Sequence, residues 1–359
     1  MTVPVQINGR QIGPGHPVYV VAELSANHNQ DFDQAVRIIQ AAKQAGADAV
    51  KLQTYTPDTI TIHSNREYFH INSGTLWDGR KLHELYADAY TPWDWHPRLQ
   101  IIASELGLDL FSSAFDPTAV DFLEQMNVPA HKVASFEIVD ISLIQKMART
   151  GKPLIMSTGM ASLEEIDEAV QMARLAGAEQ LALLKCTSAY PASPDEMNLR
   201  TIPKLANRFG VPVGLSDHTM GFAVPVAAVA LGASIVEKHL MLSRSHSGPD
   251  SAFSLEPQEF KSMVNAVRTA ERALGEVHFG ASAHESGTRV LRRSLFVVQD
   301  VKRGEPFTAE NVRSIRPGYG LHTRHLADVL GMCAARDVER GTPLSWELVN
   351  KNEVREPSA

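Results

Sequence analysis

Eight short apolar segments recur between residues 18 and 240, and a polar or charged residue stands at or just beyond the carboxyl end of each. Near-continuous apolar runs of six or seven residues are typical of strands that are buried on both faces of a parallel sheet. Because the carboxyl ends of such strands meet on one face, the spacing predicts one site that gathers these polar residues. The segments cover residues 18–24, 49–54, 109–115, 131–136, 153–158, 181–187, 211–216 and 234–240.

Amphipathic helix patterns separate these predicted strands. Residues 32–46 and 163–177 are clear examples, and the second is preceded by Ser162 with Glu165 three residues later, which predicts a capping box. Eight strands that are each followed by a helix predict an α/β fold of the closed (β/α)₈ type, a TIM barrel. An open doubly wound sheet is the alternative, but no G-x-G-x-x-G motif follows the first strand.

One connection is too long for a simple barrel loop. Residues 56–98 join the second and third predicted strands, and loops beyond about 15 residues usually carry function or extra structure. The aromatic residues of this insertion either wall a small-molecule pocket or pack the insertion onto the rim, and both interpretations stay open. They are Tyr68, Phe69, Trp77, Tyr86, Trp93 and Trp95.

The C-terminal part of the chain differs in kind from the rest. Residues 300–312 (DVKRGEPFTAENV) align with residues 337–349 (DVERGTPLSWELV), which predicts a small pseudo-twofold domain of short strands. A segment rich in Gly, Ala and Ser precedes it, as expected at a domain boundary. We expect a catalytic barrel domain over residues 1–280, a linker over 281–290 and a small β-rich domain over 291–359.

Composition excludes several classes of protein. A formal net charge of −7 argues against nucleic acid or an acidic membrane surface as a partner. The two cysteines, Cys186 and Cys333, are too few for a disulfide framework and are compatible with a reducing compartment. No secretory signal and no apolar run of roughly 20 residues is visible. We therefore expect a soluble, cytoplasmic protein.

Three lysines lie in or beside the apolar segments: Lys51, Lys132 and Lys185. An unpaired ammonium group is costly in such a place, so each lysine either pairs with a buried carboxylate or faces a ligand. Hydroxyl side chains accompany them at the strand ends, and lysines with hydroxyl groups are typical of a phosphate or oxyanion site. These hydroxyl residues are Ser112, Ser113, Ser135, Ser157, Thr158, Thr187 and Ser216.

Two histidines end the last two predicted strands. Neutral imidazoles of His218 and His239 on adjacent strand ends can share a divalent ion and leave coordination positions open. Only two protein ligands favour an exchangeable Mn²⁺ or Mg²⁺ over a structural zinc ion, although core histidines held by hydrogen bonds remain the alternative. Asp217, Glu237 and Asp250 are candidates for groups that hold water or stand behind these ligands.

Glu23 ends the first predicted strand. A carboxylate that faces lysines and a metal can orient water or relay a proton, or it can simply pair with Lys51. We give Cys186 a low rank as a nucleophile, because a catalytic thiolate needs a nearby base.

In these contexts the residues resemble the sialic acid synthase family of phosphoenolpyruvate-condensing enzymes, which join a (β/α)₈ barrel to a C-terminal antifreeze-like (SAF) domain. Three stretches (AELSANHN, KLQTYTPDTIT and GTLWDGRKLHELY) are most similar to the pseudaminic acid branch, whereas GPD at 248–250 is more typical of the sialic acid branch. The similarity covers nearly the whole chain. Its other markers are SSAFD, HKVAS, KPLIMSTGM, KCTSAYP, GLSDHT, EKHL, GPDSAFSL and IRPGYG.

The resemblance implies a transferase reaction in which C3 of phosphoenolpyruvate attacks the aldehyde of an open-chain 2-acetamido sugar. Water then adds at C2, and the tetrahedral intermediate expels phosphate by C–O cleavage. For the pseudaminic branch the sugar is 2,4-diacetamido-2,4,6-trideoxy-L-altrose. The alternative is an N-acetylneuraminic or legionaminic acid synthase, which acts on N-acetylmannosamine or a related sugar.

The resemblance also implies roles for individual residues. His218 and His239 bind the divalent metal, and Glu23 positions water or a sugar oxygen. Gln53, Tyr190 and Asp250 contact the sugar or metal-bound water. The groups that hold phosphoenolpyruvate are the side chains of Lys51, Lys132, Ser135, Ser157 and Ser216, and the backbone or a hydroxyl of Ser112–Ser113.

Arg316, in IRPGYG, matches an arginine that the family extends from the antifreeze-like domain towards the N-acyl group of the sugar. In that family the domain covers the barrel of the other subunit, so the resemblance implies a domain-swapped homodimer. Two further classes are less consistent with the sequence. A 3-deoxy-heptulosonate-type synthase lacks the repeat domain, and an ice-binding protein needs none of the polar residues at the strand ends.

Overall fold

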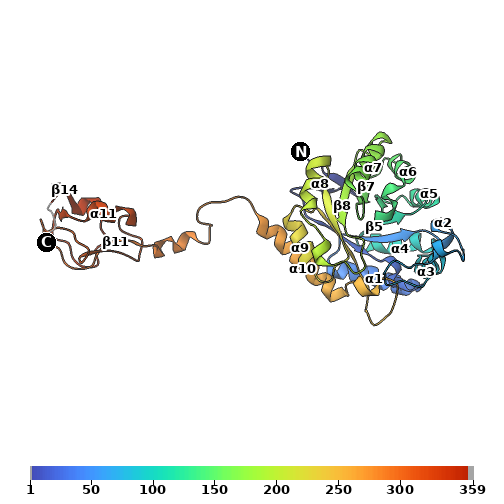
Figure 1. The fold of residues 1–359 in the computed structure, drawn as a ribbon. Helices are drawn as coiled ribbons and strands as arrows, with labels where there is room; N and C mark the ends of the chain where they lie inside the picture. The colour runs from blue at the N-terminus through green and yellow to red at the C-terminus, as the bar shows by residue number, and fades with distance from the viewer. Residues whose placement is uncertain (1, 355–359) are drawn as a thin grey trace. The chain divides into compact units, whose positions relative to one another are not determined.

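The computed structural model describes residues 2–354, with side chains as far as Asn350. The chain folds into two compact units, Met1–Gly275 and Glu276–Ala359 (Figure 1). No helix in the described residues is both long enough and apolar enough to cross a bilayer.

The first unit is a closed barrel of eight parallel strands surrounded by helices (Figure 1). The strands neighbour one another in chain order, and β10 closes the barrel against β3. This confirms the predicted (β/α)₈ fold. The strands are β3 (Tyr19–Glu23), β4 (Ala49–Thr54), β5 (Asp109–Ala114), β6 (His131–Val133), β7 (Leu154–Ser157), β8 (Leu181–Cys186), β9 (Val213–Asp217) and β10 (Ile235–His239).

Helices follow the strands, as the amphipathic patterns predict. Ser162 caps α7, and the reciprocal bond from Glu165 completes the predicted capping box. The helices around the barrel are α1 (Phe32–Ala45), α4 (Trp95–Glu105), α5 (Pro117–Gln125), α6 (Ile141–Ala148), α7 (Leu163–Leu175), α8 (Thr201–Phe209), α9 (Ala223–Ala230) and α10 (Pro257–Leu274). Short 3₁₀ turns in the loops are η1 (Ser25–His28), η3 (Ser135–Val139), η4 (Pro194–Glu196) and η5 (Ser251–Phe253).

A layer of apolar side chains fills the interior of the barrel below the strand ends. It shows which side chains of each strand point inward. Strands β1 (Val5–Ile7) and β2 (Arg10–Ile12) form an antiparallel hairpin whose apolar side chains join this layer. Because side chains alternate along a strand, the residue two positions beyond each member of the layer also points inward. The strand members are Tyr19, Val21, Ala49, Phe111, Ile155, Ala182, Leu184 and Ile235, and Ala130, directly before β6, belongs to the same layer.

The long connection after β4 contains its own short elements. These are α2 (Pro57–Ile60), the 3₁₀ turn η2 (Glu67–Phe69) and α3 (Leu82–Ala89). Tyr86 packs edge-on against Tyr55 next to β4, and Trp93 donates its indole N–H to the Tyr55 carbonyl at 3.0 Å. Part of the aromatic content therefore packs the insertion onto the barrel rim.

The second unit is built from the near-repeat. Val301 and Val338 exchange two backbone hydrogen bonds of 2.8 Å, and the Asp300 and Asp337 carboxylates accept from Arg340 N and Arg303 N respectively. The two copies thus pair reciprocally around a common apolar core. The elements are β11 (Ser294–Val297), β12 (Val312–Ile315), β13 (Met332–Ala334), β14 (Val349–Val354), α11 (Leu326–Val329), η6 (Ser286–Leu291), η7 (Thr323–His325) and η8 (Trp346–Leu348).

A buried ion pair on the outer side of the barrel gives a stability prediction. The Lys238 ammonium lies 2.6 Å from the Asp217 carboxylate, and both side chains are fully buried. We expect Lys238→Met to lower the free energy of unfolding by about 3–5 kcal/mol, because a buried carboxylate loses its partner. Urea denaturation measures this loss. Arg208→Met, which removes the exposed Arg208–Asp167 pair, should cost at most about 1 kcal/mol, and similar losses would contradict the prediction.

Candidate functional site

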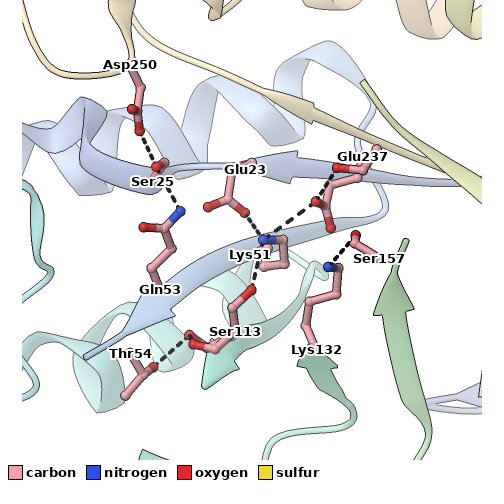
Figure 2. Close-up of polar contacts among 12 residues, drawn as sticks. Glu23, Ser25, Lys51, Gln53, Thr54, Ser113, Lys132, Ser157, Glu237 and Asp250 are labelled. Atoms are coloured by element: carbon pink, nitrogen blue, oxygen red, sulfur yellow. Dashed lines mark hydrogen bonds and ion pairs between the residues drawn. The ribbon is translucent and has the colours of Figure 1, made fainter. Parts of the chain in front are cut away.

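The carboxyl end of the barrel gathers inward-pointing polar side chains above the apolar layer. Each of them except Ser216 stands two residues beyond a member of that layer, so strand alternation directs its side chain into the barrel. Ser216 is the register partner of Glu237 on the neighbouring strand, so its side chain points the same way. All of them are buried. They are Glu23, Lys51, Ser113, Lys132, Ser157, Ser216 and Glu237, most of which are labelled in Figure 2.

Lys51 is the centre of this cluster. Its ammonium lies 2.5 Å from a Glu23 carboxylate oxygen and 3.7 Å from Glu237, and it donates a hydrogen bond to the Ser113 hydroxyl at 3.2 Å (Figure 2). The four residues come from β4, β3, β10 and β5, so only the closed barrel brings them together. One lysine therefore holds two carboxylates in place.

The pKa values of the two carboxyl groups are shifted in opposite directions. Burial raises the pKa of Glu23 to about 7, and this effect exceeds the attraction of Lys51. Burial also opposes ionisation of Glu237, but Lys51 and Lys132 outweigh it and lower the pKa of that carboxyl group. Two carboxyl groups whose pKa values are pushed apart are typical of a site in which one stays charged and the other exchanges a proton.

Lys132 is the second lysine of this cluster, and no carboxylate of the described residues forms an ion pair with it. Its ammonium donates to the Ser157 hydroxyl at 2.7 Å and to the Val133 carbonyl at 2.8 Å. Burial lowers its pKa, and Glu237 opposes that shift. Nearby, the Ser135 hydroxyl accepts a hydrogen bond from Gly159 N at 3.2 Å. A charged ammonium with neutral partners, beside serine hydroxyls, is suited to an anionic ligand.

The two predicted metal ligands lie side by side. The ring centroids of His218 and His239 are 5.3 Å apart. His218 donates from Nδ1 to the Thr187 carbonyl at 3.0 Å, which leaves its Nε2 lone pair free for a ligand. Nδ1 of His239 is buried without a hydrogen-bond partner. Burial, with His218 and Lys51 nearby, lowers the pKa of His239 well below its usual range.

These features fit a divalent ion with few protein ligands. The lowered pKa of His239 keeps its ring neutral, with the lone pair that metal coordination requires. Burial lowers the pKa of His218, but the contact with Cys186 outweighs burial and raises it, so metal binding there would displace a proton. Among the described residues, no group of three or more His, Cys, Asp or Glu side chains has the spacing of a metal site. Two imidazoles would leave the other coordination positions to water or to a substrate oxygen.

Two of the predicted sugar contacts, Tyr190 and Asp250, lie in loops at the carboxyl end of the barrel, and the third, Gln53, lies in β4. The Ser25 hydroxyl donates to the Asp250 carboxylate, which also accepts from Ala26 N at 3.2 Å. Gln53 donates its side-chain amide to the same hydroxyl at 3.0 Å (Figure 2). Tyr190 packs against His218, with ring centroids 4.6 Å apart. Gln53 and Asp250 thus join in one network, and Tyr190 borders the histidine pair.

Three residues singled out in the sequence lie outside this cluster. Ser112 points outward and shares a 2.7 Å hydrogen bond with the Thr54 hydroxyl, which contacts His96. Lys185 follows outward-facing Leu183 and donates to the Cys186 carbonyl at 2.6 Å. Asp217 accepts from Lys238. The side chains of Ser112 and Lys185 therefore do not join the anion site. Asp217, which was expected to hold water or to stand behind the metal ligands, is instead paired with Lys238.

Arg316 belongs to the second unit. It lines a hollow of about 530 Å³ together with Arg289, Arg292 and Arg293, so several positive charges gather around it. A basic hollow of this kind suits an anionic or carbonyl-bearing partner.

Glu137 is a candidate that the sequence analysis did not select. Burial raises its pKa to about 7, and its Oε2 atom is buried without a hydrogen-bond partner. It stands two residues after Ser135 in the turn that follows β6. Its place in HKVASFE, just beyond a strand end, was the available signal, but a carboxylate in a loop is normally solvated.

Comparisons with known proteins agree with this architecture. The model of the NeuB family matches residues 38–279, and the SAF domain model matches residues 292–350. A pseudaminic acid synthase of Campylobacter jejuni is 46% identical over 91% of this chain and 95% of the relative. A pseudaminic acid synthase of Helicobacter pylori is 45% identical over 94% of this chain and 99% of the relative.

A solved structure extends the similarity to the fold. The N-acetylneuraminic acid synthetase of Leptospira borgpetersenii, in complex with citrate, superposes with a TM-score of 0.70 at 30% identity, covering 80% of this chain and 95% of that one. The NeuB model spans well over half of the residues, and the relatives align with nearly all of them. The chain therefore belongs to the NeuB family, and it carries a C-terminal SAF domain.

Proposed function

We propose that this chain condenses phosphoenolpyruvate with 2,4-diacetamido-2,4,6-trideoxy-L-altrose to give pseudaminic acid and phosphate. The observation that carries the reaction is the pair of buried lysines, Lys51 and Lys132, at the same barrel end as the paired imidazoles. The sugar assignment rests on the 45–46% identity to two pseudaminic acid synthases. An N-acetylneuraminic or legionaminic acid synthase is the alternative, supported by the similar Leptospira structure and the GPD sequence.

Phosphoenolpyruvate would lie against the lysine cluster. Its carboxylate and phosphate groups need cations and hydroxyl donors, which Lys132, Ser157, Ser113 and Ser135 can supply. Lys51 already balances Glu23 and Glu237, so its main contribution would be to orient them and to lend positive potential. Ser216, which donates to Glu237 at 3.0 Å, would hold that carboxylate in position.

His218 and His239 would hold the divalent ion, Mn²⁺ or Mg²⁺. When bound, the ion polarises the sugar aldehyde and makes it a better electrophile for C3 of phosphoenolpyruvate. Two observations support this role: the Thr187 carbonyl fixes the His218 ring, and Nδ1 of His239 is buried without a hydrogen-bond partner. Gln53, Asp250 and Tyr190 would orient the sugar so that its aldehyde faces the enol carbon.

Glu23 would manage the water that adds at C2. Its Oε1 is buried and makes no hydrogen bond, so it can accept from that water, while Lys51 holds the other oxygen. Addition of water forms the tetrahedral intermediate. Cleavage of its bond between C2 and the phosphate oxygen then releases phosphate, which Lys132 would bind. The proton from water passes to the carboxylate, whose raised pKa suits a general base.

We further propose that the chain works in the cytoplasm as a homodimer in which domains are exchanged. Arg316 of one protomer would reach the N-acyl group of the sugar in the barrel of its partner. The basic hollow around Arg316 supports this role, because it offers positive charge and room for the carbonyl oxygen of an N-acyl group. The predicted linker, residues 281–290, would permit the exchange, with its last residues from Ser286 forming the start of η6.

A substrate panel tests the proposed function. Purified protein with Mn²⁺ and phosphoenolpyruvate is incubated separately with the diacetamido trideoxy sugar and with N-acetylmannosamine, and phosphate release is measured. We expect release with the first sugar and little with the second. Release with N-acetylmannosamine alone would overturn the sugar assignment, and release with neither sugar would overturn the reaction.

The pKa of Glu23 gives a pH prediction. A carboxyl group with a pKa of about 7 is protonated at lower pH, so kcat/KM should fall as the pH drops below about 7 if the carboxylate is the active form. We expect Glu23→Gln to lose this acid limb together with most of its activity. Glu137→Gln is the matched control, because the pKa of Glu137 is also raised to about 7. If only Glu137→Gln removes the acid limb, Glu137 rather than Glu23 is the base.

A further inference from the structure

The loop over residues 73–79, between β4 and α3, is built to hold one aromatic side chain. The Asp78 carboxylate accepts hydrogen bonds from the backbone of Ser73, Gly74 and Thr75 at 2.9–3.2 Å, and from the Thr75 hydroxyl at 3.0 Å. These bonds lower the pKa of Asp78, with the Thr75 backbone bond as the largest cause. The loop is therefore ordered by its own contacts, and it presents the half-buried indole of Trp77.

Trp77 connects three loops above the barrel. Its indole N–H donates to the Pro249 carbonyl at 3.0 Å, across 172 residues of sequence. Its ring lies 5.5 Å from that of Tyr190, which in turn lies 5.0 Å from Phe253. The neighbouring Asp250 is held from the other side by Ser25 and Ala26. The insertion thus contributes one wall beside the proposed sugar contacts.

The distance from the histidine pair to this wall suits the length of a sugar. The ring centroid of Tyr190 lies 4.6 Å from that of His218 and 5.5 Å from that of Trp77. The indole ring is therefore within about 10 Å of the His218 imidazole. An open-chain hexose extends about 6 Å from C1 to C6. A sugar whose aldehyde lies near His218 can therefore bring its far end to Trp77.

The chemistry of this wall disfavours a hydroxyl group. The single donor of the indole is already used by the Pro249 carbonyl, and the Tyr190 ring packs beside the indole ring. What Trp77 can offer a ligand is therefore ring surface. A methyl group gains from burial against such a surface, whereas a hydroxyl group would lose water without gaining a partner.

We propose that Trp77 is a specificity-determining residue that packs against C6 of the sugar and selects a 6-deoxy substrate. This inference rests on the proposed function, because it assumes a six-carbon sugar whose aldehyde reacts near His218. The contact is present before and during the reaction, so it should act mainly on KM for the sugar. Phosphoenolpyruvate lies on the lysine cluster and should not be affected.

The test compares two sugars with three proteins. Wild type, Trp77→Phe and Trp77→Gln are assayed with the 6-deoxy diacetamido sugar and with its 6-hydroxy counterpart. For Trp77→Gln we expect the kcat/KM ratio that favours the 6-deoxy sugar to fall about 10-fold or more, through KM for the sugar. Trp77→Phe keeps an apolar ring and should keep the ratio within about 3-fold of wild type.

Two controls make the outcomes distinguishable. Tyr68→Gln changes an 86% exposed aromatic of the same insertion and should leave all constants unchanged. Unchanged KM for phosphoenolpyruvate and an unchanged melting temperature show that each variant is folded. If wild type turns over neither 6-deoxy nor 6-hydroxy diacetamido sugar, the proposed function fails. If wild type prefers the 6-deoxy sugar and Trp77→Gln keeps that preference, the inference about Trp77 alone is wrong.

Discussion

Lys51→Met is expected to lower kcat/KM by about 10³-fold or more and to destabilise the barrel by about 3–5 kcal/mol. The ammonium group contacts Glu23, Glu237 and Ser113 in a fully buried setting. Without it, two buried carboxylates face each other with no cation between them. Phosphate release with both substrates measures the first effect, and urea denaturation measures the second.

The stability loss should depend on pH in a defined direction. Without Lys51 the pKa of Glu23 rises further above its value in the unfolded chain, and Glu237 loses the largest of the attractions that lower its pKa. Protonation of these carboxyl groups therefore favours the folded variant. Its deficit relative to wild type should be largest above pH 7 and should shrink as the pH falls towards 5. A deficit that is independent of pH would contradict this account.

Lys185→Met is the matched control for Lys51→Met. Lys185 is also a strand-end lysine, but it faces outward and bonds to Cys186 O and to the Thr187 hydroxyl. We expect a loss of kcat/KM below about 10-fold and a stability change without the pH dependence. Equal effects of the two variants would show that the loss with Lys51→Met does not come from the carboxylate pair.

His239→Ala is expected to lower kcat by about 10³-fold and to weaken Mn²⁺ binding by at least about 100-fold. The reason is that the variant removes one of the two imidazoles whose ring centroids lie 5.3 Å apart. Titration calorimetry or electron paramagnetic resonance with Mn²⁺ alone measures binding independently of turnover. Undiminished turnover in the presence of excess chelator would refute the metal proposal.

His131→Ala controls for loss of a buried imidazole. His131 is fully buried and also has an unpaired Nδ1, but its Nε2 lies 2.8 Å from Glu124 on the outer side of the barrel. We expect it to lower stability and to leave Mn²⁺ affinity within about 3-fold of wild type. Weaker Mn²⁺ binding in both variants would indicate a general structural effect.

The barrel itself was predictable because its signals are local. Eight apolar runs separated by amphipathic helices specify strand number and order, and Ser162 with Glu165 specifies a helix start. The near-repeat of the second unit was equally visible, and the reciprocal bonds of Val301 with Val338 match it. Each of these features depends on neighbours within one segment or on direct similarity between two segments.

The sequence did not allow a prediction of which strand-end lysine side chains point into the barrel. Lys51, Lys132 and Lys185 have similar surroundings in sequence, yet only the first two point into the barrel. Strand β8 is apolar on both faces from Leu181 to Leu184, so it lacks the alternation of period two that would reveal its facing. Only closure of the barrel around its apolar layer assigns Lys185 to the outer side.

By itself, the sequence determined the fold class, the order of the elements and the kinds of side chain at the strand ends. The tertiary structure decided which of them meet: Glu23 and Glu237 on Lys51, Gln53 with Asp250 through Ser25, and Trp77 on Pro249. The physical reason is that secondary structure follows from local periodicity, whereas these contacts join residues from separate strands and loops. Their geometry exists only once the barrel has closed.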